Sequence, residues 1–131
     1  EPFDAFVFLR PDVKFLNSLD TRYFSLLQGN RVCIPNFHLF PDFNDRFFLC
    51  SKEHVFLYTQ LFDDMLEFSK HYPLHSERFQ YEMLTQKYNL RIVYIPIHFN
   101  RIRACGRAVR DYKPEKHPNH PKNKFSMHFI K

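Results

Sequence analysis

Glycine is the residue whose scarcity most limits what this chain can form, because only two of its 131 residues are glycine. The loops that hold nucleotide phosphates in Rossmann domains and P-loop proteins need several glycines at fixed offsets, since the backbone there turns tightly and approaches the ligand closely. Two glycines satisfy neither pattern. If a nucleotide binds to this chain, its site is therefore not one of those glycine-rich loops.

The composition indicates one globular domain, with 44% hydrophobic residues, 17 phenylalanines and a formal charge of +5 that suits anionic partners. No apolar run approaches the ~20 residues that span a bilayer, so we expect no integral membrane segment. Three cysteines without close spacing argue against a disulfide framework, which favours a reducing, cytoplasmic compartment. The chain opens without a basic signal-peptide region or an initiator Met, which is typical of a mature form or a piece of something longer.

The first apolar run ends in a cation, a proline and a carboxylate. Residues 5–9 (Ala-Phe-Val-Phe-Leu) have the length and composition of a buried strand, and Pro11 should end it because proline lacks an N–H group. Arg10 and Asp12 then lie at the carboxyl end of the strand, where open α/β sheets bind ligands. A carboxylate suits a divalent metal and a guanidinium suits a phosphate. The alternative is an ordinary turn that Asp12 caps.

The remaining pattern predicts an α/β domain with a mixed or mostly parallel sheet flanked by helices. Further strands are expected at residues 31–34, 47–50 and 91–99, an extended piece at 13–15, and helices at 20–27, 53–71 and 77–88. Pro96 inside the last run requires an edge strand or a bulge. The apolar stripe of the helix at 53–71 is expected to face the core. We assign residues 1–112 to this domain and residues 113–131 to a basic tail rich in His, Pro and Lys.

Three stretches are distinctive when they are taken together. They are residues 3–15 with Arg10-Pro11-Asp12, then Asn44-Asp45-Arg46-Phe47 at the end of an aromatic loop, then His75-Ser76-Glu77-Arg78 leading into residues 92–97 and the arginines that follow. Their order and spacing resemble the second half of a group of GT-A type nucleotide-sugar glycosyltransferases from algae, bacteria and large DNA viruses. The resemblance covers roughly residues 3–110. Phe8 stands where that motif has its first arginine, and no second carboxylate lies two residues from Asp12 as in an Asp-x-Asp motif.

The resemblance implies that the chain transfers a sugar from a nucleotide-sugar donor to a glycan or other hydroxyl acceptor, with help from a divalent metal, Mn²⁺ or Mg²⁺. It implies Asp12 and His98 as metal ligands, Arg10, Arg101 and Arg103 as ligands of the donor diphosphate, Asp45 as the base, and Phe37, His38 and Asn44 as acceptor contacts. The ordinary alternatives are a capped turn for Asp12, a surface histidine for His98, solvated arginines, and an Asx-turn for Asp45. The part of the domain that holds the base and ribose of the nucleotide is expected to be a missing N-terminal half, or to come from a partner chain.

Two other functions compete with this hypothesis. The basic carboxyl-terminal third, with its phenylalanine and tyrosine side chains, is compatible with a nucleic-acid-binding module, although no RRM, KH or zinc-finger signature is present. The chain is also compatible with a non-catalytic fragment or subunit of a larger transferase. Convergence of Arg101, Arg103 and Arg107 on Asp12 in a cleft would favour the enzyme, whereas their spread along an open face with aromatic residues would favour nucleic-acid binding.

Overall fold

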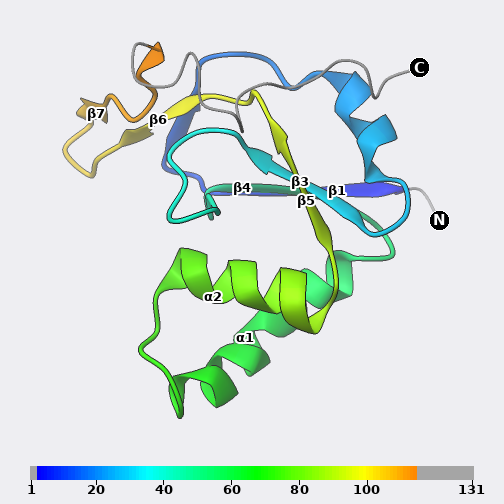
Figure 1. Ribbon diagram of the computed structural model, residues 1–131. Helices are drawn as coiled ribbons and strands as arrows, with labels where there is room; N and C mark the ends of the chain where they lie inside the picture. The colour runs from blue at the N-terminus through cyan, green and yellow to red at the C-terminus, as the bar shows by residue number, and fades with distance from the viewer. Residues whose placement is uncertain (1–2, 115–131) are drawn as a thin grey trace.

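The computed structural model describes residues 3–114 and shows an α/β arrangement of two sheets and three helical segments (Figure 1). The strands are β1 (Ala5–Leu9), β2 (Val13–Phe15), β3 (Arg31–Pro35), β4 (Phe47–Ser51), β5 (Arg91–Ile95), β6 (Phe99–Ile102) and β7 (Ala108–Val109). The helices are η1 (Thr21–Leu27), which is a 3₁₀-helix, α1 (Val55–Ser69), and α2 (Ser76–Glu82), which continues as the π-helical turn η2 (Met83–Lys87). None of the helices within these residues is long and apolar enough to cross a bilayer. The predicted tail lies almost wholly outside the described residues.

The larger sheet has the strand order β1-β4-β3-β5. Strand β4 runs antiparallel to both β1 and β3, and β3 runs parallel to β5 with Arg31 opposite Arg91. A mixed sheet is therefore confirmed, whereas the expectation of a mostly parallel sheet is wrong. Strand β1 lies at an edge and is only half buried, although its apolar run predicts a buried strand. The apolar run of residues 5–9 indicates that its side chains face a core, but it does not indicate whether the strand has neighbours on one edge or on both.

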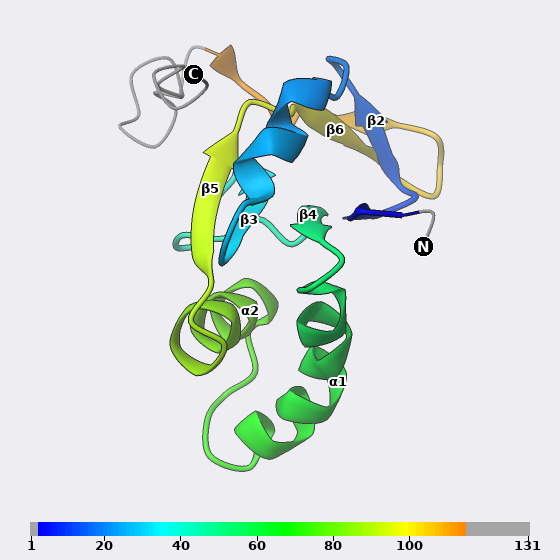
Figure 2. The ribbon, with the colours of Figure 1, turned by 90° about the vertical axis from the view of Figure 1, so that its right-hand side faces the viewer.

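The two faces of the larger sheet build two separate cores. Because side chains alternate along a strand, β3 places Val32 and Ile34 on one face and Cys33 on the other. The first face packs against α1 and α2, which lie together on one side of the sheet in Figures 1 and 2. The second face packs against η1 and residues of the smaller sheet. The larger sheet is therefore the middle layer of the molecule.

The smaller sheet, with the order β2-β6-β7, corrects the prediction of a single strand over residues 91–99. The chain leaves the larger sheet after β5 and enters the smaller sheet at β6. Pro96 lies in the break, which Asn17, two residues after the end of β2, bridges. The Nδ2 of Asn17 donates to the Pro96 carbonyl at 2.6 Å, and its Oδ1 accepts from the His98 N–H at 2.7 Å. The proline thus marks a change of sheet, and not an edge position or a bulge within one strand.

Helix α1 leaves part of its apolar stripe outside the core. Leu61 is buried, and Tyr58 and Met65 are partly buried against the sheet and α2, as the periodicity predicts. Phe62 is 66% exposed and Leu66 is also exposed, so the expectation that the whole stripe faces the core is wrong. Successive side chains of a helix point about 100° apart. A stripe that contains both Leu61 and Phe62 is therefore wider than the face that one packing surface can cover, and Phe62 is left outside.

The cysteines are free thiols in two kinds of environment. Cys33 and Cys50 are buried, and burial raises the pKa of each thiol to about 12. They fill space in the two cores as small apolar residues. Cys105 lies exposed between β6 and β7.

Candidate functional site

A group of charged side chains lies around the end of β1, the end near which Figure 1 shows β6 and β7. We call this group the charged cluster; it comprises Arg10, Asp12, His38, Asp45, Arg46, Glu77, Arg101 and Asp111. Backbone hydrogen bonds join the stretches that contribute these residues. The Arg10 N–H donates to the Arg46 carbonyl at 3.2 Å, and the Ile102 N–H donates to the Asp12 carbonyl at 2.7 Å. Loop 36–46 and β6 are thereby held against the segment that follows β1.

Arg10 and Asp12 bind each other at the end of β1. The Nε and Nη2 atoms of Arg10 lie 2.8 and 2.6 Å from the two carboxylate oxygens of Asp12. The hydrogen bonds of this pair raise the pKa of Arg10 and lower the pKa of Asp12, and the charges of Asp45 and Glu77 add to the shift of Arg10. Both side chains stay partly exposed. Both oxygens of Asp12 are therefore engaged, while the Nη1 group of Arg10 lies outside the pair.

Asp45 and Arg46 form the buried part of the cluster. Oδ2 of Asp45 accepts a hydrogen bond from Ser76 Oγ at 2.9 Å, so that the loop is tied to the first turn of α2. Oδ1 lies 3.8 Å from Nη1 of Arg46, which is longer than a hydrogen bond. Among the described residues, three atoms of this pair, Asp45 Oδ1 and Arg46 Nε and Nη1, are buried without a hydrogen-bond partner. Unpaired buried polar atoms are costly, so hydrogen bonds to these atoms would stabilise the loop.

Arg101 is held by a carboxylate from the segment after β7. Nε and Nη2 of Arg101 donate to Asp111, whose side chain is only 3% exposed, and the closest of these contacts is 2.7 Å. The backbone N–H of Arg101 also donates to Asp111 at 2.8 Å. Burial alone would raise the pKa of Asp111, but the hydrogen bonds from Arg101 prevail and lower it. His38 Nδ1 lies 3.9 Å from the same carboxylate.

His38 is the neutral member of the cluster at physiological pH. Burial of the ring and then the charge of Arg46 lower the pKa of His38 below its ordinary value, while the carboxylate of Asp111 opposes them. The residue adopts a left-handed conformation with φ of 51°, and its side chain is 37% exposed. His38 is therefore placed where it can meet a bound molecule as an uncharged imidazole.

Phe37 and Asn44, the other two predicted acceptor contacts, lie inside the protein. The Phe37 ring is 1% exposed and packs in the core beneath the smaller sheet. Asn44 is fully buried; its Nδ2 donates to the Phe37 carbonyl at 2.9 Å and its Oδ1 accepts from the Arg46 N–H at 3.0 Å. Both residues therefore stabilise the conformation of loop 36–46. Their predicted contact with an acceptor substrate stays a prediction.

The two predicted metal ligands, Asp12 and His98, are not brought together. The Asp12 carbonyl bonds to Ile102 at one end of the β2–β6 ribbon, and the His98 carbonyl bonds to Leu16 at the other, about 13 Å away along the strands. His98 instead stacks on Tyr112 at 3.7 Å, with its Nε2 3.2 Å from Asn36 Oδ1. No group of three or more His, Cys, Asp or Glu side chains suited to a metal occurs within residues 3–114. The donors at this place do not fit a divalent cation, so Mn²⁺ or Mg²⁺ stays a prediction without support from the geometry.

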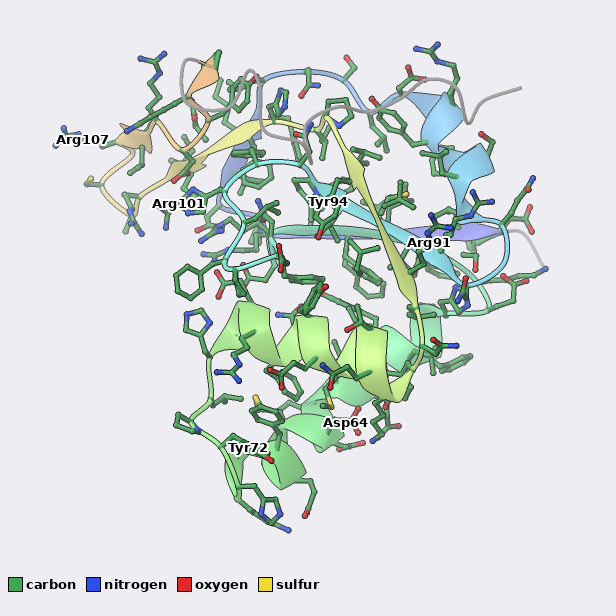
Figure 3. All side chains as sticks on the ribbon, in the orientation of Figure 1. Asp64, Tyr72, Arg91, Tyr94, Arg101 and Arg107 are labelled. Carbon is green, nitrogen blue, oxygen red and sulfur yellow. The ribbon has the colours of Figure 1, made fainter. Side chains whose placement is uncertain are left out.

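Arg103 lies apart from the charged cluster, in a second basic region. It lines a hollow on the β6–β7 hairpin together with Arg107, Arg110 and Lys113, and none of the lining residues within 3–114 is a carboxylate. We call this region the basic hollow. Figure 3 shows Arg101 close to the sheet and Arg107 farther out on the hairpin. Of the three arginines whose convergence on Asp12 would favour an enzyme, Arg101 lies in the charged cluster, while Arg103 and Arg107 line the basic hollow.

The structure adds three residues to the predicted site: Arg46, Glu77 and Asp111. Arg46 and Glu77 stand beside Asp45 and Ser76 in two of the three distinctive stretches, so their position in the sequence is a usable signal. The sequence around Asp111 contains no such signal, because Asp111 contacts Arg101 only when the β6–β7 hairpin has folded.

Comparison of the chain with protein-family models, with curated proteins and with solved structures found no match. The residues of the chain and their geometry therefore carry the functional conclusion.

Proposed function

We propose that this chain is a glycosyltransferase-like domain that transfers a sugar from a nucleotide-sugar donor to the hydroxyl group of an acceptor. One observation carries the proposal: the stretches that resemble such enzymes are distant in sequence but are hydrogen-bonded to one another. Residues 3–15 meet residues 44–47 through Arg10 and Arg46, and residues 44–47 meet residues 75–78 through Asp45 and Ser76. Residues 3–15 also pair with β6 along β2.

The donor's diphosphate is assigned to the guanidinium groups of Arg10 and Arg101. When a sugar leaves its nucleotide, the bond between the anomeric carbon and the phosphate oxygen breaks, and the electron pair departs with the diphosphate. Positive groups that are already in place stabilise this charge. Each of the two arginines uses Nε and Nη2 to bind its carboxylate, which leaves Nη1 for a phosphate oxygen. Their carboxylate partners hold both guanidinium groups in position.

Asp45 is assigned the role of general base. Its carboxylate accepts the proton of the acceptor hydroxyl while the oxygen of that hydroxyl attacks the anomeric carbon, which inverts the configuration at that carbon. Ser76 already holds Oδ2, and the buried Oδ1 has no hydrogen-bond partner within residues 3–114. The exposed, neutral ring of His38 contacts the sugar in this arrangement. No step is assigned to a metal ion, because both oxygens of Asp12 are bound to Arg10.

Calorimetric titration with UDP and GDP, each with and without Mn²⁺, tests the donor site. We expect one of the nucleotides to bind, and Arg10→Gln to weaken that binding about tenfold through loss of a charged hydrogen bond. Arg22→Gln is the matched control, since Arg22 forms the same kind of two-residue-apart pair with Asp20, on η1. Failure of both nucleotides to bind under all four conditions would overturn the proposal.

The base is tested by measuring nucleotide release from a panel of UDP- and GDP-sugars. We expect Asp45→Asn to lower the rate about 100-fold or more while nucleotide binding, which reports an intact fold, is retained. Asp63→Asn on the exposed side of α1 serves as the control and should leave the rate unchanged. An Asp45→Asn variant that binds nucleotide and releases it from a sugar as fast as the wild type would exclude Asp45 as the base.

The basic hollow favours nucleic-acid binding as a second candidate function. Four cationic side chains gather around it, which is an electrostatic footprint for phosphates. Among residues 3–114 no aromatic ring lines it, so that part of the chain offers no stacking platform for bases there. Binding of a fluorescent oligonucleotide that weakens steeply with salt, and weakens again in Arg107→Gln, would support this candidate; binding that is indifferent to both would reject it.

A further inference from the structure

A groove of about 440 Å³ runs between α1 and α2 on the side of the molecule away from the smaller sheet. Its lining residues are Tyr58, Leu61, Phe62, Met65, Leu74, Ser76, Phe79 and Gln80. Figure 2 shows the two helices side by side, with the segment that joins them at one end. The volume is within the range of small-molecule sites.

The groove has an apolar side and a polar end. Phe62 and Leu74 are exposed although both are large and apolar, and they face the groove together with the buried ring of Phe79. Exposed apolar side chains around one hollow mark a binding surface more often than a scatter of single residues does. The polar members of the lining are Tyr58, Ser76 and Gln80, and Gln80 is hydrogen-bonded to each of the other two.

A hydrogen-bond chain leads from this polar end to Asp45. The Tyr58 hydroxyl donates to Gln80 Oε1 at 3.3 Å, Gln80 Nε2 donates to Ser76 Oγ at 3.0 Å, and Ser76 Oγ donates to Asp45 Oδ2 at 2.9 Å. Every donor in the chain points toward the carboxylate. Burial, and next the charge of Asp45, raise the pKa of Tyr58 to about 12, which agrees with their closeness. The groove therefore begins at the residue that holds the proposed base.

We propose that the groove between α1 and α2 binds the apolar part of an amphiphilic acceptor, with the hydroxyl-bearing end of that acceptor beside Ser76. This inference rests on the proposed function, because it takes Asp45 as the base that receives the acceptor's proton. A purely polar sugar would leave its hydroxyl groups unpaired along Leu61, Phe62 and Met65, which costs binding energy. A molecule with a polar head and a hydrocarbon tail satisfies both ends of the groove.

Octyl β-D-glucoside and methyl β-D-glucoside, which share a head and differ in the tail, are the probes. Below its micelle-forming concentration, we expect the octyl compound to bind about tenfold or more tightly than the methyl compound, because the groove buries its tail. Phe62→Ser should weaken binding of the octyl compound about fivefold or more. Phe56→Ser is the matched control, since Phe56 lies on the same helix, is 79% exposed, and does not line the groove. Its effect should stay within about twofold.

Two results would overturn the inference while the proposed function stands. One is equal affinity for the two glucosides, or an equal loss in the two serine variants, in a protein that still binds UDP or GDP. The other is a dimer in light scattering that Phe62→Ser dissociates, which would assign the groove to a second copy of the chain. Conversely, tail-dependent binding that needs Phe62, in a protein that binds no nucleotide, would keep the groove as an amphiphile site and overturn the proposed function.

Discussion

At the scale of single residues, His38 links the charged cluster to the stability of the protein. Its pKa is lowered in the folded state, first by burial and then by the charge of Arg46. In the unfolded chain the pKa returns to about 6.5, so below that pH the unfolded chain binds a proton that the native state resists. The free energy of unfolding contributed by His38 is therefore intact above about pH 6.5 and falls as the pH drops through the lowered native pKa.

His38→Asn should flatten this pH dependence. Asparagine tolerates the left-handed conformation that His38 adopts, and it does not titrate. Urea unfolding between pH 5 and pH 8 should show a steeper loss of stability toward low pH in the wild type than in the variant. Identical slopes for the two proteins would contradict the lowered pKa.

Much of the membership of the site could be predicted from the sequence, but the partners could not. The strand-end motif and the expected resemblance point to Arg10, Asp12, Asp45 and Arg101, and the fold places all four in the charged cluster. The pairing of Asp12 with Arg10 depends on side-chain geometry. The pairing of Asp111 with Arg101 depends on the path of the β6–β7 hairpin. Phe37 and Asn44 illustrate the same limit, since an aromatic or amide residue in a loop points inward or outward without a difference in sequence pattern.

At the scale of elements, the Arg101–Asp111 pair fastens the segment after β7 to β6. Asp111→Ala removes the carboxylate and leaves the largely buried guanidinium and the Arg101 N–H without their acceptor. We expect a loss of about 3 kcal/mol in the free energy of unfolding, measured by urea denaturation. Glu82→Ala is the comparison, because it breaks the more exposed Arg78–Glu82 pair on α2 and should cost about 0.5 kcal/mol. Equal losses in the two variants would mean that the pair does not fasten the hairpin.

The elements whose bounds were predicted well are those that turn residues delimit. Strand β3 ends at Pro35, and η1 is followed by Gly29, whose φ is 65°, so the local sequence marks where each one stops. The run over residues 91–99 predicts one strand because both of its halves are apolar, although β5 and β6 belong to different sheets. The two-residue strand β7 carries no periodic signal at all.

At the scale of the whole molecule, the three-layer arrangement predicts an order of protection. Strands β3 and β4 lie in the interior of the larger sheet with both faces covered, so their amides should exchange with solvent only through global unfolding. The smaller sheet and η1 cover one face only, and their amides should exchange through local opening at lower free energy. Native-state hydrogen exchange measures this order, and equal protection in both sheets would contradict it.

The parallel pairing of β3 with β5 has a consequence for how the chain reaches its fold. Arg31 pairs with Arg91, sixty positions later, so the pair closes a long loop that contains β4, α1 and α2. Closing such a loop costs entropy before any contact repays it, which slows folding. During synthesis, which proceeds from the N-terminus, one edge of β3 stays unpaired until residues 91–95 have left the ribosome. The nascent chain therefore exposes a hydrophobic strand edge while about sixty further residues are synthesised, and this edge is accessible to a chaperone during that interval.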